Sequence, residues 1–123
     1  MRTRLVLSWI ASVGLLGVLS LAAPASAQTL SNAEFHKLAP VAKTAADHQK
    51  LAAYYHAQAA EQEAQAKLHE GIAAAASKKR DDDSWETARA AAHYAEHARE
   101  AAEALTDLAK LHEGMAERAA GKK

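Results

Sequence analysis

The segment Lys78-Lys79-Arg80-Asp81-Asp82-Asp83 decides the fold, because it separates two long stretches made almost entirely of helix-forming residues. Alanine alone supplies 29 of residues 28–123, and Glu, Gln, Lys, Arg and Leu supply most of the others. The basic half of the segment follows the first stretch and the acidic half precedes the second, which suits the partial charges at helix ends. We therefore predict helices at about 44–77 and 84–120, the second capped by Asp83 or Ser84.

So short a connection makes two long helices antiparallel neighbours. The sequence thus predicts an all-α protein whose domain, residues 44–120, is an antiparallel two-helix hairpin. The preceding segment, residues 28–43, carries a capping box at Ser31-Asn32-Ala33-Glu34 and then Pro40, which predicts one short N-terminal helix.

Both long helices fit a heptad repeat, which predicts the surface along which they pack. The expected stripes are Leu51, Tyr54, Gln58, Glu61, Gln65, Leu68 and Ile72 in the first helix, and Tyr94, His97, Ala101, Ala104, Leu108, Leu111 and Met115 in the second. Large apolar side chains are few, so a lone hairpin would be marginally stable. We therefore predict a homo-oligomer, most simply a dimer that forms a four-helix bundle.

Two features of these stripes carry further expectations. The polar midsection of the first stripe either specifies the register or is left exposed by a seam nearer Ala57, Ala60 and Ala64. The segment Lys67-Leu68-His69-Glu70-Gly71-Ile72-Ala73 recurs as Lys110-Leu111-His112-Glu113-Gly114-Met115-Ala116, which indicates a duplicated helix. Glycine costs about 1 kcal/mol against alanine in a helix, so we expect a close helix approach at both glycines.

The N-terminal residues have the pattern of a secretory signal peptide: Arg2 and Arg4, an apolar run to about Ala23, and then Ala25-Ser26-Ala27. We predict cleavage after Ala27 and a periplasmic or secreted product without a transmembrane anchor. The alternative is an uncleaved anchor, because the run approaches the roughly 18–20 residues that span a bilayer. The sequence has no cysteine, which excludes a lipoprotein anchor and disulfides. Residues 28–123 have a formal charge of −2, which gives no basic patch for nucleic acid.

Histidine is the unusual component of the chain, with seven residues after the predicted cleavage site: His36, His48, His56, His69, His93, His97 and His112. On the predicted hairpin, His69 lies level with His93 and one turn from His97. Two histidines at i and i+4 share a helix face, and imidazole suits Cu(II), Zn(II) or Ni(II). We predict a metal site there, with the alternative that the histidine in the heptad stripe is a packed, hydrogen-bonded core residue.

At the other end of the hairpin, His48 lies level with His112, which predicts a second and poorer metal site with Asp47, Glu113 or Met115 nearby. His36 and His56 are expected to be surface residues.

No residues are arranged as a nucleophile with its base, and the GxGxxG, P-loop and HExxH motifs are absent, so we do not expect an enzyme. The expected function is a periplasmic or secreted binding module that holds a transition metal or an envelope protein through paired histidines. The alternative is a structural, chaperone-like or stress-protective protein similar to late-embryogenesis-abundant helices, without a metal site.

Several segments also resemble a group of small exported bacterial proteins with a two-helix pattern and no assigned activity. The resemblance covers about residues 43–117 and rests on Asp47-His48-Gln49-Lys50-Leu51-Ala52-Ala53-Tyr54-Tyr55, Leu68-His69-Glu70-Gly71-Ile72-Ala73, Ala92-His93-Tyr94 and Leu111-His112-Glu113-Gly114-Met115-Ala116. Members often have His-Cys where this chain has His93-Tyr94, so a thiol role is absent here. The resemblance draws attention to His48, His69, His93 and His112 rather than His56 or His97.

Overall fold

The computed structural model describes residues 29–121, which form three helices: α1 (Asn32–Leu38), α2 (Ala45–Ser77) and α3 (Asp82–Ala120). No strand occurs within this range, so the predicted all-α class is confirmed. None of the helices between residues 29 and 121 is long and apolar enough to cross a membrane. The predicted signal peptide, residues 1–27, lies outside the described residues.

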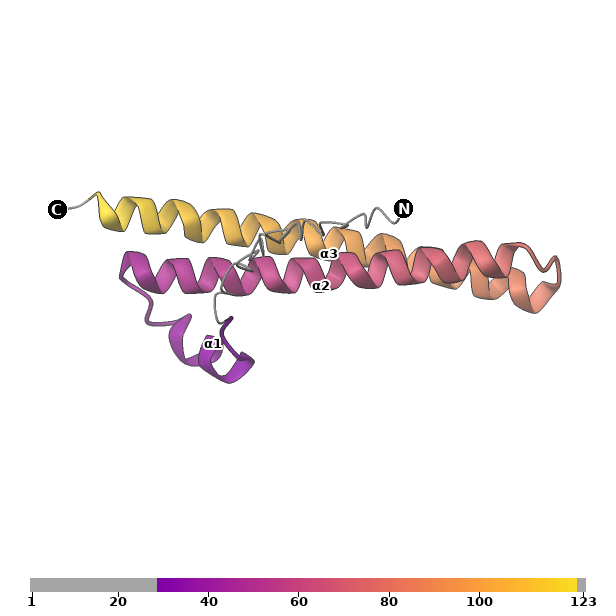
Figure 1. Ribbon diagram of the computed structural model, residues 1–123, viewed down its shortest axis with the longest axis horizontal. Coiled ribbons are helices and arrows are strands. Elements are labelled where there is room, and N and C mark those ends of the chain that lie inside the picture. The colour runs from indigo at the N-terminus through magenta and orange to yellow at the C-terminus, as the bar shows by residue number, and fades with distance from the viewer. Residues whose placement is uncertain (1–28, 122–123) are drawn as a thin grey trace, which may run out of the picture.

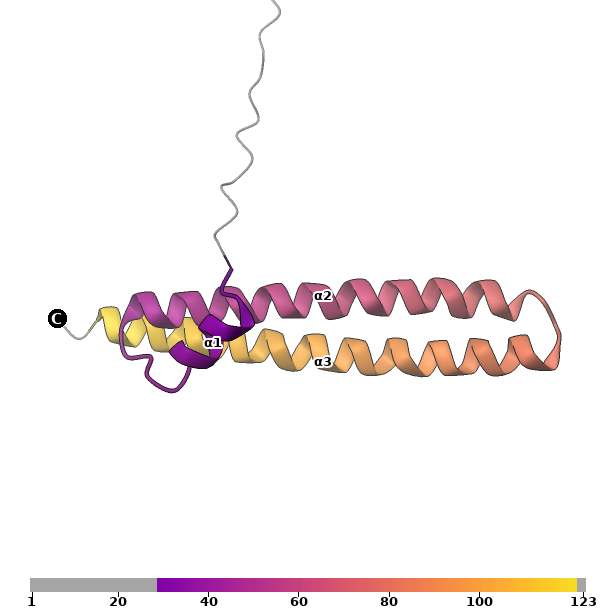
Figure 2. The ribbon, with the colours of Figure 1, turned by 90° about the horizontal axis from the view of Figure 1, so that it is seen from below.

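The two long helices, which we call the helix pair, lie side by side and run in opposite directions, as Figures 1 and 2 both show. This arrangement is consistent with the predicted hairpin. The connection lies at one end, which we call the tip. The beginning of α2 and the end of α3 lie at the other end, which we call the base. Helix α1 packs beside α2 near the base (Figure 1).

Local side-chain contacts explain where each helix begins. The hydroxyl of Thr44 accepts from the backbone N–H of Asp47, whose carboxylate accepts from the Thr44 N–H at 3.0 Å, and Ser31 and Glu34 form the same capping box for α1. The predicted cap of α3 is wrong by two or three residues, because Asp81 accepts from the Ser84 N–H at 2.8 Å. Arg80 adopts a φ of 59°, and this left-handed residue turns the chain early enough for Asp81 to be the cap.

The seam between α2 and α3 is built mainly from alanine, and the predicted stripes are wrong by one residue. The buried apolar residues of the pair are Leu51, Ala52, Ala59, Ala66 and Ala76 in α2, and Ala88, Ala91, Ala95, Ala98, Ala102, Ala109 and Ala116 in α3. The alanines repeat at heptad spacing, each directly after a residue of the predicted stripes or their continuation. One residue is a rotation of about 100° around a helix, so the larger side chains turn away from the seam.

Two further expectations about the seam are also corrected. The alternative seam at Ala57, Ala60 and Ala64 does not form, since the last two are exposed. A Cβ built on Gly71 would meet nothing within 4 Å, and one on Gly114 would meet only the Arg118 guanidinium at 3.4 Å. Neither glycine is therefore required by a close helix approach.

Helix α1 covers part of α2 through aromatic contacts. The ring of Phe35 stacks on Tyr54 with centroids 4.2 Å apart, and the Tyr54 hydroxyl donates to Asn32 Oδ1 at 2.8 Å. Leu51, one turn before Tyr54, is fully buried and is the largest such side chain among the described residues. The only large side chain in the core thus lies where α1 adds a third layer.

Candidate functional site

The closest pairing of histidines across the helix pair joins His48 of α2 to His112 of α3. Their Nδ1 atoms lie 3.1 Å apart and their rings stack with centroids 5.3 Å apart. Both residues occupy heptad positions of the seam, three or four residues from buried alanines, so the packing of the backbones brings the two imidazoles together. The structure therefore brings together the two histidines that the sequence placed level with each other near the base.

The environment of His112 favours its neutral imidazole. Partial burial, with the neighbouring charge of His48 as a second cause, lowers the pKa of His112 below its ordinary value. The ring of Tyr55 also stacks on His112, with centroids 5.6 Å apart and an angle of 16° between the planes. His112 thus contacts two aromatic rings of α2. A neutral imidazole presents one unprotonated nitrogen, which is the form that binds a metal ion.

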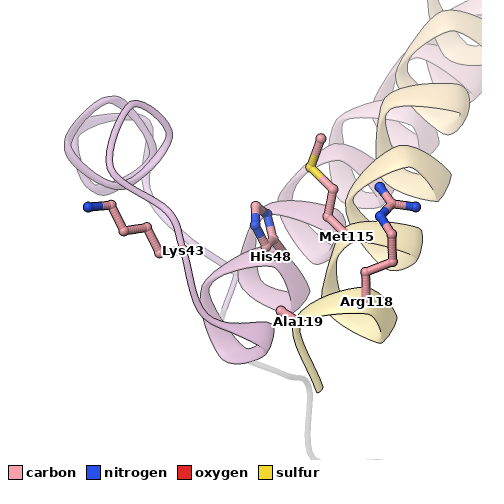
Figure 3. Close-up of a pocket in the computed structure, with 5 residues that line it drawn as sticks. All are labelled: Lys43, His48, Met115, Arg118 and Ala119. Carbon is pink, nitrogen blue, oxygen red and sulfur yellow. The ribbon is translucent and has the colours of Figure 1, made fainter. Parts of the chain in front are cut away.

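A shallow pocket opens beside His48 and is lined by Lys43, His48, Met115, Arg118 and Ala119 (Figure 3). Met115 and Arg118 come from α3, about one and nearly two turns beyond His112, so both long helices contribute to the pocket. Figure 3 shows the thioether of Met115 on the same side of the helix pair as the His48 ring. A thioether sulfur and one imidazole thus line this pocket, and they are soft and borderline ligands for metal ions.

An ion pair between His56 of α2 and Glu113 of α3 lies next to the histidine pair. His56 Nε2 lies 2.7 Å from Glu113 Oε1, and both side chains are about half exposed. The sequence placed His56 at the surface, which is correct, but did not predict this partner. The contact joins α2 to α3 within one residue of Tyr55 and His112 and so fixes their relative position.

The second histidine pair lies near the tip on α3 alone. His93 and His97 are exposed, their Nε2 atoms lie 3.2 Å apart, and their rings meet edge to face. Glu100 Oε2 lies 3.1 Å from His97 Nδ1. A carboxylate only accepts, so this contact holds the proton of a neutral His97 on Nδ1 and leaves its Nε2 lone pair toward His93.

His69 is not part of that pair. Its ring instead packs against Tyr94, with centroids 4.1 Å apart, and its carboxylate neighbour Glu70 pairs with Arg99. Within residues 29–121, no three His, Asp or Glu side chains form a group placed to hold a metal ion. The His69, His93 and His97 trio is therefore not assembled as a three-ligand group, because His69 lies at the seam and the other two face solvent.

The two histidine pairs have the separation that a shared metal ion requires. Imidazole nitrogens bind transition metals at about 2.0–2.1 Å, so two adjacent ligands of one ion lie about 2.9–3.4 Å apart for angles between square and tetrahedral. The observed separations of 3.1 and 3.2 Å fall in this range. A hydrogen bond between the rings gives the same distance, with the proton in the place of the ion.

Comparison of the chain with models of protein families, with curated proteins and with solved structures found no match.

Proposed function

We propose that this chain is an exported helical binding module that holds a transition-metal ion between His48 and His112. In this proposal the domain is an antiparallel hairpin, and the ion joins its two helices at the base. The observation that carries the proposal is the 3.1 Å separation of two Nδ1 atoms from different helices. The residue spacing of a single helix cannot produce this contact, so it depends on the tertiary fold.

The chemistry of the donors favours copper. Two imidazoles suit Cu(II), Zn(II) and Ni(II), whereas a thioether adds preference for Cu(I). Met115 lines the same pocket as His48 and is the third donor in this proposal. Lys43 and Arg118 line that pocket as well, and their positive charges favour an anionic ligand on the open side of the ion.

The pair His93 and His97 is a second and weaker site in this proposal. Both donors come from one exposed helix surface, so water competes for the ion and the site has no cross-helix component. Glu100 contacts Nδ1 of His97 and so orients the ring to bind the ion through Nε2. This site contains the two histidines that the sequence places at i and i+4, and it leaves out His69, which packs against Tyr94.

Calorimetric titration of the chain with Cu(II), Ni(II) and Zn(II) tests the proposal. We expect the tighter binding event to be lost in His112→Ala and in His48→Ala, and the weaker one in His93→Ala. His36→Ala is the matched control, because His36 is exposed on α1 and away from both pairs. No binding by the wild-type chain, or equal losses in His36→Ala and His112→Ala, would overturn the proposal.

The contribution of Met115 is separable from that of the histidines. Met115→Leu keeps the apolar volume and removes the sulfur. We expect it to weaken Cu(I) binding, measured by competition with a chromophoric Cu(I) chelator, and to leave Zn(II) binding unchanged. Equal Cu(I) affinity in both proteins would remove Met115 from the donor set.

A structural or stress-protective role is the second candidate, because the seam is formed almost wholly by alanine side chains that bury little area each. This candidate needs no metal. A chain that is helical only after drying or in alcohol, measured by circular dichroism, would support it. Helicity in dilute buffer would favour the binding module instead.

Export is part of the proposal and has its own test. Residues 1–27 lie outside the described structure, and their sequence pattern is the support for a signal peptide. N-terminal sequencing of the protein recovered from a bacterial periplasm should begin at Gln28. A product that keeps Met1 and sediments with membranes would favour the uncleaved anchor.

A further inference from the structure

One broad side of the helix pair carries most of its exposed large apolar side chains. Each of five such residues directly precedes a seam position, and they are Leu68, Ile72, Tyr94, Leu108 and Leu111. When two helices face each other and run in opposite directions, the residues that precede the seam project to the same side in both. These five side chains therefore form one surface, which we call the apolar face.

Helix α1 already covers the part of this face that lies nearest the base. Tyr54 also precedes a seam position, and Phe35 of α1 stacks on it. Leu51, which precedes Ala52, is completely buried. Figure 2 looks onto this side and shows α1 in front of the helix pair near the base, with the rest of the surface open toward the tip. Leu68, in the open part, is 56 % exposed.

The opposite side of the helix pair is rich in charged and polar side chains. Both ion pairs between α2 and α3, His56–Glu113 and Arg99–Glu70, involve residues that directly follow seam positions and so lie on this side. The same side of α3 carries further charged residues: Arg89, Glu96, Glu103, Lys110 and Glu117. On the open part of the apolar face, by contrast, the sequence places one carboxylate, Glu61, and one imidazole, His97. The helix pair is therefore amphipathic as a whole.

The geometry points to a second copy of this chain as the occupant of the apolar face, with the same face of each copy packed on the other. The open part runs from about Gln58 to Ala75 on α2, which is roughly 27 Å at 1.5 Å per residue, and two helices are about 20 Å wide. Two such surfaces bury on the order of 1,100 Å² together. That area clears the roughly 1,000 Å² expected of a biological interface between two protein surfaces.

Charge and core composition both favour a copy of the same chain. A face with a single carboxylate meets its own copy without a set of like charges in opposition, as an isologous contact requires. The core within one chain has alanine at every buried position except Leu51, and a second copy would add the large side chains of both faces to it. The inference does not depend on metal binding.

Sedimentation of the metal-free chain over a range of concentrations tests the inference. We expect a dimer at tens of micromolar, and a monomer for the double variant Leu68→Glu with Ile72→Glu. The matched control is Ala60→Glu with Ala92→Glu, which adds the same two charges at exposed positions of the opposite side and should remain dimeric. A wild-type monomer at every concentration, or an equal loss of dimer in both variants, would overturn the inference.

Chemical protection gives a second readout that does not require disruptive substitutions. The chain has no cysteine, so a single Leu68→Cys or Lys67→Cys introduces the only thiol. We expect maleimide labelling of Leu68→Cys to slow at least severalfold from submicromolar to high micromolar protein, while Lys67→Cys, on the charged side, keeps a constant rate. Equal and constant rates at both positions would contradict a dimer through the apolar face.

Discussion

The Nδ1 atoms of His48 and His112 lie 3.1 Å apart although 64 residues separate them in the chain. The contact exists because α2 and α3 pack in opposite directions along a seam of alanines. Their small side chains allow the two helices to approach closely, so that larger side chains at seam positions contact each other across the pair. The alanine seam, the apolar face and the His48–His112 pair are thus consequences of one helix register.

Larger side chains at buried seam positions should destabilise the chain. Ala109 is completely buried, so Ala109→Leu has no space without displacing α2, and we expect a loss of about 1–3 kcal/mol in the free energy of unfolding. Ala60→Leu makes the same chemical change at an exposed position and should stay within about 0.5 kcal/mol of wild type. Urea denaturation of the three proteins measures both effects. Equal stability of the two variants would place the seam elsewhere.

Replacing either helical glycine by alanine should stabilise the chain. Gly71 has open space where a Cβ would lie, so Gly71→Ala should raise the free energy of unfolding by about 1 kcal/mol through helix propensity alone. Gly114→Ala should gain a similar amount, since the flexible Arg118 side chain can move aside. Thermal denaturation at fixed protein concentration checks this. A loss of stability in Gly71→Ala would revive the close helix approach that the sequence suggested.

The connection at the tip should prefer glycine at residue 80. The left-handed conformation costs an L-amino acid roughly 1–2 kcal/mol, and β-branched residues adopt it least readily. Arg80, with a φ of 59°, should therefore be replaceable by glycine without loss, whereas Arg80→Val should destabilise the chain by about 1 kcal/mol or more. Comparing the unfolding midpoints of the two variants tests the turn. Identical midpoints would show that residue 80 is not left-handed in solution.

Lowering the pH should reduce the free energy of unfolding of the metal-free chain, because His112 lies in the helix pair near its open end. The folded pKa of His112 is lowered, chiefly by burial, while unfolded histidine titrates near about 6.5. Between those two values the unfolded chain binds more protons, so stability is complete above about pH 6.5 and falls as the pH drops toward the folded pKa. Unfolding in the presence of a chelator should show this slope. His112→Gln should flatten it and the exposed His36→Gln should not; unchanged slopes in His112→Gln would contradict the burial of this ring.

Local features of the fold could be predicted from the sequence because each depends on residues close together in the chain. The capping boxes at Ser31 and Thr44 and the two long helices belong to this class. The seam could not be predicted in the same way. Large apolar residues such as Leu68 and Leu111 favour the interior, whereas alanine occupies both the seam and much of the surface and so gives no periodic contrast.

The same one-residue error explains what was and was not predicted about the histidines. The sequence places His48 and His112 level with each other, and the one-residue rotation turns both of them into the seam, where they meet. His69 also turned into the seam, away from the exposed His93, and met Tyr94 instead. Levels along a hairpin follow from the length of its connection, but the facing of each side chain depends on a rotation that the sequence did not define.

The most direct test of the central proposal is the melting temperature of the His93→Ala, His97→Ala double variant with and without Cu(II). Only the cross-helix pair remains in this protein, and a ligand at a hundred times its Kd adds about 2.7 kcal/mol to the stability of the folded state. For a domain of this size we predict a rise on the order of 10 °C, abolished by the further change His112→Ala. No rise in the double variant, or the same rise without His112, would contradict a metal ion held between α2 and α3.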